Sequence, residues 1–180
     1  MTLFYTADLH LGHANIIKLC NRPFSSLLEM DETLIANWNA RVTNGDTIYV
    51  IGDLMFRVAS DPGTYLSRLK GKKRLISGNH DASWIKKTEI TKYFQSVERL
   101  SVISTGRHKV TLCHYPMMSF EGEYLIYGHI HNHKNDTYWP LLRTMDNALN
   151  AGVEVNDYQP VTFDELIENN RIFRGNTDYR

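Results

Sequence analysis

The sequence predicts an α/β fold in which two packed, mixed β-sheets are flanked by helices. Short β-rich runs recur along the chain, and each ends in a cluster of Gly, Asp, Asn or His. Helical patterns separate these runs in the first half of the chain, which implies parallel strands joined by right-handed crossovers. The stretch 96–127 is strand-rich with few helical signals. Together these observations indicate two sheets with helices outside them.

The strands and helices are expected at defined positions. We expect strands at 3–7, 47–51, 73–77, 109–113 and 124–127. We expect helices at 31–41, 65–70, 82–87 and 164–169. The helix 31–41 carries Leu34, Ile35 and Trp38 on one face, and Asn44-Gly45 follows it as a stop signal.

Length and composition favour one ordinary globular domain spanning 1–180. Lys plus Arg equals Asp plus Glu at 20 each, so no overall charge favours nucleic acid or an anionic membrane as the main partner. No apolar run approaches the roughly 20 residues that span a bilayer, and no signal peptide is recognised. Two cysteines without a CxxC pair fit a reducing compartment, so we expect a cytoplasmic protein.

The polar clusters at the strand ends point to a metal site. In open α/β sheets, ligands bind beyond the carboxyl ends of the strands, so residues distant in sequence can meet there. The clusters supply carboxylates, an amide and several imidazoles, a set that suits Mn²⁺, Fe or Zn²⁺. Gly52 before Asp53 and Gly128 before His129 would let the backbone come close to a metal or ligand.

Five sequence blocks in order carry a family resemblance. The blocks are Asp8-Leu9-His10, Gly52-Asp53, Gly78-Asn79-His80-Asp81, His114 and Gly128-His129-Ile130-His131. This pattern resembles the calcineurin-like metallophosphoesterase superfamily, and the stretches 8–13 and 150–156 are similar to its small bacterial and phage members. The resemblance implies a four-layer αββα sandwich.

The resemblance also implies a centre of two divalent metal ions, with Mn²⁺ expected and Fe or Zn²⁺ as alternatives. The ligands implied for the first ion are Asp8, His10 and His131. Those implied for the second ion are Asn79, His114 and His129, and Asp53 is implied to bind both ions. A hydroxide shared by the two ions would attack phosphorus, and the ions would offset the charge on the phosphoryl oxygens. The implied substrate is a phosphomonoester or phosphodiester of a small molecule or nucleotide.

Other residues near the blocks have less specific expected roles. His80 is implied to hydrogen-bond the phosphate and to protonate the leaving oxygen. Asp81 would either orient His80 or cap the helix that follows it.

Further residues are candidates for substrate contact. His13 and Arg57 are candidates for binding the substrate phosphate, although a solvated surface arginine is the commoner role for Arg57 and for Arg22. His133 is expected in an exposed loop. Met117, Met118 and Phe120 would form a wall of the cleft or a pocket for the leaving group.

Two other functions compete with a small-molecule phosphoesterase. A nuclease would use the same centre on DNA or RNA, and its binding would fall sharply with rising salt. A non-catalytic scaffold should lack metal ligands or the His80 equivalent, and this sequence lacks neither. The oligomeric state is left open.

Overall fold

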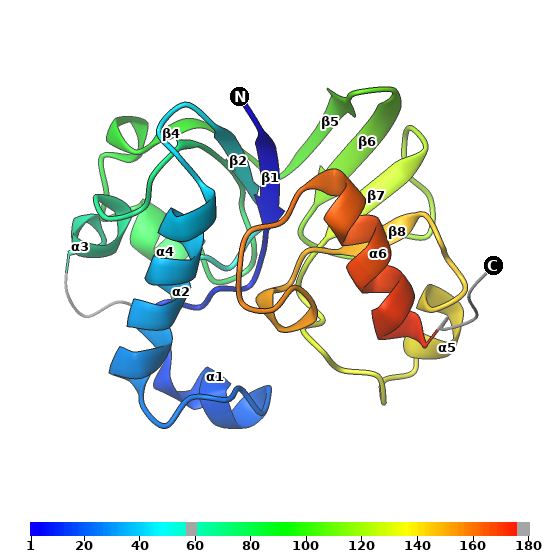
Figure 1. The fold of residues 1–180 in the computed structure, drawn as a ribbon, viewed down its shortest axis with the longest axis horizontal. Helices are drawn as coiled ribbons and strands as arrows, with labels where there is room; N and C mark the ends of the chain where they lie inside the picture. Colours follow the sequence, from blue (N-terminus) through cyan, green and yellow to red (C-terminus); the bar gives the residue numbers. More distant parts are fainter. Residues whose placement is uncertain (57–60, 176–180) are drawn as a thin grey trace.

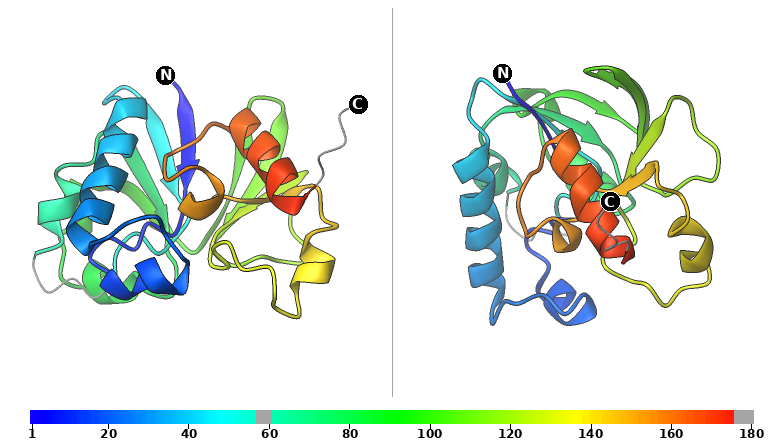
Figure 2. Two further views of the ribbon diagram at one scale, coloured as in Figure 1. Left: turned by 60° about the horizontal axis from the view of Figure 1, so that its bottom comes forward. Right: turned by 45° about the vertical axis from the view of Figure 1, so that its right-hand side comes forward.

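The computed structural model describes residues 1–56 and 61–175, and Arg57 therefore lies outside the described residues. Two four-stranded sheets lie side by side, with helices on their outer sides (Figure 1). Figure 2 shows the same two-sheet arrangement from two further directions. The α/β sandwich expected from the sequence is confirmed.

The first sheet is parallel throughout. Its strands in spatial order are β1 (Leu3–Thr6), β2 (Thr47–Val50), β3 (Lys72–Ile76) and β4 (Phe94–Glu98). Helical segments connect successive strands, and such crossovers return the chain in the same direction. All four carboxyl ends consequently lie at one edge of the sheet.

The second sheet is mixed, because it contains both antiparallel and parallel strand pairs. Both sheets were expected to be mixed, but the first contains parallel pairs throughout. Its strands in spatial order are β5 (Leu100–Thr105), β6 (His108–Cys113), β7 (Tyr124–Tyr127) and β8 (Ala148–Asn150). β5 and β6 form an antiparallel hairpin around Gly106, which has a φ of 57°. β6, β7 and β8 run parallel to one another.

Two long helices and several short ones cover the sheets. The α-helices are α1 (Ala14–Leu19), α2 (Leu27–Arg41), α3 (Gly63–Leu66), α4 (Ala82–Ile85), α5 (Trp139–Leu142) and α6 (Phe163–Arg174). Two 3₁₀ turns occupy Ile90–Lys92 and Val153–Val155. None of the helices within the described residues is long and apolar enough to cross a membrane.

The core consists of layers on both faces of the sheets. Between the sheets, Tyr5 and Ile51 of the first half pack with Leu112, Ile126 and Leu149 of the second. Because side chains alternate across a strand, the neighbouring residues of the first sheet face the helices instead. There α2 packs through its buried face, and α5 covers the outer face of the second sheet.

The expected strands agree with the structure to within about one residue, and the helices differ more. α2 begins at Leu27, earlier than expected, because the Ser26 side chain accepts a hydrogen bond from Glu29 N. The helix expected at 65–70 was wrong in extent. Asn39 accepts from Lys70 N and donates to Arg68 O, so these backbone groups bond to a side chain and α3 ends at Leu66.

Candidate metal centre

The seven ligands expected from the sequence come together where strands of both sheets end. Asp8 and His10 follow β1, Asp53 follows β2, and the remaining candidates follow β3, β6 and β7. Asp8 N donates to Gly52 O at 3.0 Å, and His10 N donates to Asp53 O at 3.0 Å. His129 N donates to Asp8 Oδ2 at 2.9 Å, which ties the second sheet to the first.

One group of ligand atoms comes from Asp8, His10 and His131. One ligand atom of each residue lies within 4.8 Å of the others. Asp8 Oδ1 and His10 Nε2 are buried and have no hydrogen-bond partner among the described residues. Since an unpaired buried polar atom is costly, these two atoms fit a site that binds a cation.

A second group comes from Asp53, His114 and His129, again with ligand atoms within 4.8 Å of one another. Asn79 Oδ1 lies 3.1 Å from His114 Nε2 and 3.1 Å from His129 Nδ1. His114 Nδ1 donates to Ile51 O at 2.9 Å, which leaves Nε2 facing Asn79 and Asp53. This group therefore contains a carboxylate, an amide and two imidazoles.

Asp53 faces both groups. Its Oδ2 lies 3.6 Å from His10 Nε2 and 3.3 Å from His114 Nε2. Its Oδ1 accepts a hydrogen bond from His80 N at 2.9 Å. The carboxylate is thus oriented with one oxygen between the two groups of ligands.

The ionisable groups of the centre influence one another strongly. Burial raises the pKa of Asp8 to about 7. Burial opposes protonation of His114, but its hydrogen bond with Asp53 and nearby carboxylates raise its pKa to about 9. For Asp53, burial is outweighed by the hydrogen bond from His114, and the pKa falls to about 2. Such coupled, opposed shifts are typical of functional sites, where a cation would replace protons.

The backbone is left-handed at five of the seven candidate ligands. The φ angles are 57° at Asp8, 53° at His10, 52° at Asp53, 73° at His129 and 51° at His131. Each such conformation costs roughly 1–2 kcal/mol in a non-glycine residue, although Asp and His adopt it more often than most. Strain concentrated in this way is characteristic of binding and catalytic sites.

Three glycines make room for ligand side chains. A Cβ on Gly78 would lie 2.2 Å from Asp53 Oδ1, and one on Gly128 would lie 2.7 Å from Asp8 Oδ2. The same holds for Gly52 beside His114. The sequence predicted that the backbone at Gly52 and Gly128 would lie close to a metal or ligand. In the structure, the groups close to these glycines include the side chains of the candidate ligands His114 and Asp8.

His80 lies at the accessible side of the centre. Its side chain is 37% exposed, and its Nε2 lies 3.9 Å from Asp53 Oδ2. Its ring contacts Phe56 edge-on at a centroid distance of 4.8 Å. Phe56 also stacks on His13 at 3.8 Å, and His13 Nδ1 lies 3.3 Å from His10 Nδ1. His13 therefore borders the site, whereas His133 is exposed and contacts Leu19 O.

Neither role expected for Asp81 agrees with its contacts. Its buried carboxylate accepts hydrogen bonds from Asp53 N, Leu54 N, Gly78 N and Trp84 Nε1, at 2.8 to 3.0 Å. It makes no capping bond to the backbone of α4. Asp81 therefore fixes the loop that carries Asp53. Its carboxylate is occupied by these four donors, so it neither orients the His80 ring nor caps α4.

The expectation that Arg22 is a solvated surface residue was wrong. Arg22 is 4% exposed, and its guanidinium donates to Asp8 O at 2.6 Å and to Leu9 O at 2.8 Å. It also pairs with Glu154 at 2.7 Å. Glu154 had no expected role from the sequence, although its carboxylate contacts His131 Nδ1 at 2.9 Å. The sequence feature that could have drawn attention to Glu154 was its place in the 150–156 stretch, which carries part of the family resemblance.

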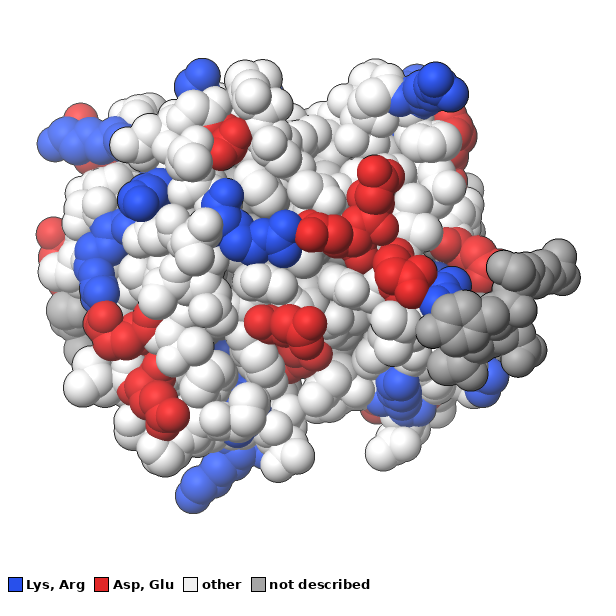
Figure 3. Space-filling view, in the orientation of Figure 1, with Lys and Arg blue, Asp and Glu red and all other residues white. Residues whose placement is uncertain are grey.

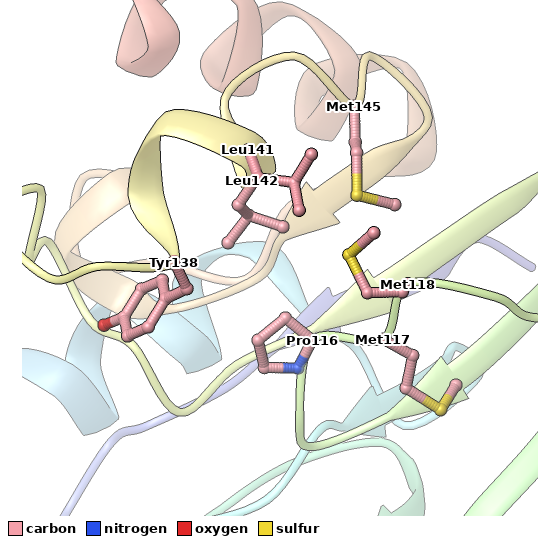
Figure 4. A pocket seen from close by; sticks show the side chains of 7 residues that line it. All are labelled: Pro116, Met117, Met118, Tyr138, Leu141, Leu142 and Met145. Atoms are coloured by element: carbon pink, nitrogen blue, oxygen red, sulfur yellow. The ribbon is translucent and has the colours of Figure 1, made fainter.

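An apolar hollow lies beyond His114. It has a volume of about 110 Å³ and lies between the segment after His114 and α5 (Figure 4). The residues that line it are Pro116, Met117, Met118, Tyr138, Leu141, Leu142 and Met145. Phe120 instead packs against the core cluster on the outer face of the second sheet. A leaving group in this hollow stays a prediction.

Known proteins resemble this chain over most of its length. No family model matches it. It is 36% identical over 185 residues to the uncharacterised protein MJ1445 of Methanocaldococcus jannaschii, which covers 98% of this chain and 97% of the relative. The gene 66 protein of Mycobacterium phage L5 is 27% identical over 162 residues, covering 72% of this chain and 77% of that protein. The crystal structure of the Aquifex aeolicus protein AQ665, of unknown function, matches with a TM-score of 0.72 and 25% identity, covering 92% of this chain and 97% of that one.

Proposed function

This chain belongs to the family of MJ1445, and from that premise we propose that it is a calcineurin-like metallophosphoesterase that hydrolyses phosphoesters at a centre of two divalent metal ions. The observation that carries the proposal is the pairing of two ligand groups around one carboxylate. Each group lies within 4.8 Å, and Asp53 Oδ2 lies between them. A single structural metal would need only one such group.

The donor atoms fit hard or borderline divalent ions. We propose that Asp8, His10 and His131 hold one ion, that Asn79, His114 and His129 hold the other, and that Asp53 contacts both. Oxygen and imidazole donors without thiolate favour Mn²⁺, with Fe or Zn²⁺ as alternatives. When bound, two such ions supply Lewis-acid catalysis and an activated water at neutral pH.

His80 is the proposed proton donor. Its ring is the accessible imidazole beside Asp53 and is held from one side by Phe56. An imidazole at this place could hydrogen-bond the phosphate and then give a proton to the leaving oxygen. His13, whose ring stacks on Phe56, is proposed to contact the phosphate.

We propose a phosphomonoester or phosphodiester of a small molecule or nucleotide as the substrate. The half-exposed His80 and the exposed His129 support a site that is open to solvent. A nuclease remains the second candidate. The even balance of Lys and Arg against Asp and Glu, interspersed on the face in Figure 3, gives it no particular support. A flat dependence of binding on salt would exclude it.

The test compares metal-stripped protein with protein given Mn²⁺ on bis-p-nitrophenyl phosphate and p-nitrophenyl phosphate. Asp53→Asn and His80→Ala should each remove the turnover. His108→Ala is the matched control, because His108 begins β6 at the opposite end of that strand from His114. Mn²⁺-dependent turnover lost in the two variants and kept in the control supports the proposal. Two bound ions without turnover of either compound or of oligonucleotides would favour a scaffold.

A further inference from the structure

We propose that Glu154, held in place by Arg22, is a positioning residue for His131 in the first group of metal ligands. The inference rests on the proposed function, because it concerns how one of the two ions is held. It adds a buried ion pair that lies outside the five sequence blocks. Glu154 is in the 3₁₀ turn Val153–Val155, and Arg22 follows α1.

The contact between Glu154 and His131 fixes the orientation of the imidazole. Glu154 Oε1 lies 2.9 Å from His131 Nδ1, and the side chains are 0% and 12% exposed. A carboxylate can only accept here, so Nδ1 carries a hydrogen and Nε2 is the nitrogen that remains available for a metal ion. A metal-binding histidine commonly has such a carboxylate on its other nitrogen, which fixes the ring and makes it a better ligand.

Arg22 connects this carboxylate to the other two ligands of the same group. Its Nε and Nη2 donate to Glu154 Oε1 at 3.0 and 2.7 Å. Its Nη2 and Nη1 also donate to the carbonyls of Asp8 and Leu9, the segment that carries Asp8 and His10. One guanidinium thus joins the end of β1 to the turn after β8, and Glu154 extends this connection to His131 in the loop after β7.

The arrangement is difficult to explain as a stabilising ion pair alone. Both side chains of the pair are 0% exposed, and burying an ion pair contributes little to stability after desolvation. Glu154 Oε2 is buried and has no hydrogen-bond partner among the described residues. It lies on the same side of Gly152 as Asp8 Oδ2, since both oxygens would be within 3.5 Å of a Cβ there. The carboxylates of Asp8 and Glu154 thus lie near one another, and a cation bound by the first group would offset the repulsion between them.

Cys20 is the other neighbour of this pair. One ligand atom each of Cys20, His131 and Glu154 lies within 4.8 Å of the others. These three residues could together bind a soft metal ion, and Glu154 would then be a ligand rather than a positioning residue. Cys20→Ala distinguishes the two roles, because a positioning role for Glu154 needs no thiol.

The variants separate charge, hydrogen bonding and packing. Glu154→Ala removes the acceptor for His131 Nδ1 and the partner of Arg22, and we expect the affinity for one of two Mn²⁺ ions to fall about 10–100-fold. Glu154→Gln keeps an oxygen that can accept from Nδ1 and should lose less affinity than Glu154→Ala. Glu165→Gln is the matched control, because it breaks another Arg–Glu pair, with Arg41 at 2.6 Å, on α2 and α6.

The measurement is a calorimetric Mn²⁺ titration of each variant, together with its electron paramagnetic resonance spectrum. With two equivalents of Mn²⁺ per chain, wild type and Glu165→Gln should bind two ions and show an exchange-coupled pair. Glu154→Ala should bind one ion tightly and show the signal of isolated Mn²⁺, while Cys20→Ala should match wild type.

Wild-type affinity for both ions and a coupled signal in Glu154→Ala would overturn the proposal. If circular dichroism shows that Glu154→Ala is unfolded, Glu154→Gln becomes the test. A Mn²⁺ affinity of Glu154→Gln equal to that of wild type would then overturn the proposal. Loss of one ion in Cys20→Ala would also overturn it in favour of direct ligation. The proposed function fails separately, when wild type loaded with two ions turns over no phosphoester.

Discussion

Gly52 leaves no space for a side chain beside His114. A Cβ on Gly52 would lie 2.2 Å from His114 Nδ1 and 2.6 Å from its Cγ, and the φ of Gly52 is 84°. The glycine is thus needed twice, for its left-handed backbone and for the imidazole next to it. The residue before one candidate ligand thereby determines where another can lie.

Gly52→Ala should lower both stability and the affinity for one metal ion. The left-handed conformation alone costs an alanine roughly 1–2 kcal/mol, and the clash must additionally displace His114. Gly106→Ala is the control, because it has a φ of 57° with no atom within 4 Å of its Cβ position. Urea unfolding and Mn²⁺ titration of both variants test this. Equal metal affinity in the two variants would contradict the role assigned to Gly52.

Asp81→Ala should destabilise the metal-free protein by about 2 kcal/mol or more. The change leaves three backbone N–H groups and the Trp84 indole without their acceptor, and each unpaired buried group costs about 1–3 kcal/mol. Asp136→Ala is the control, since this exposed carboxylate accepts from Tyr138. Denaturant unfolding without metal is the measurement. A loss of turnover with wild-type stability would instead support direct action on His80.

His80→Ala should reduce kcat about 10²–10⁴-fold while both ions remain bound, as expected for loss of a general acid. The reason is that His80 contacts Asp53 through its backbone N–H, which the substitution keeps. Metal content by mass spectrometry under native conditions and steady-state kinetics with Mn²⁺ give the two readings. Loss of an ion in this variant would show that His80 acts as a ligand.

Asp46 should make stability depend on pH below about 4. Its carboxylate accepts from the Thr43 hydroxyl at 2.6 Å and from the backbone N–H groups of Thr2 and Thr43. These bonds lower its pKa from an ordinary value near 3.8 to about 2. A lowered folded-state pKa contributes stability above the unfolded-state pKa and loses it as the pH falls through the folded-state value.

The measurement is the difference in free energy of unfolding between wild type and Asp46→Asn. It should be constant above pH 5 and shrink between about pH 4 and pH 2. Asp146→Asn, at an exposed aspartate, is the control. A difference that stays constant down to pH 2 would show that the Asp46 carboxylate is not stabilised in its charged form.

The strand ends and their polar residues could be predicted from the sequence because both signals are local. A β-rich run followed by Gly-Asp or Gly-Asn is visible within a few residues, and parallel topology then brings the ends together. The ion pair of Arg22 and Glu154 could not be predicted, since its partners are 132 residues apart. A lone arginine in a polar segment has the pattern of a surface residue, and only the folded chain shows what surrounds it.

Asp81 is a second residue whose partners could not be predicted from the sequence, although they are less far apart than those of Arg22 and Glu154. Its neighbours in the sequence suggested His80 or the first turn of the following helix as its partner. Its backbone partners Asp53 and Leu54 lie 28 and 27 residues away and meet it only when β2 and β3 pair. The short β8 and α5 were missed because segments of three or four residues carry almost no periodicity.

The left-handed backbone at Asp8, His10, Asp53, His129 and His131 limits which residues these positions can accept. Asp, Asn and His adopt a positive φ more often than most residues, whereas a β-branched residue at such a φ is a strained outlier. A valine or threonine at one of these positions would therefore strain the loop backbone in addition to removing a donor atom.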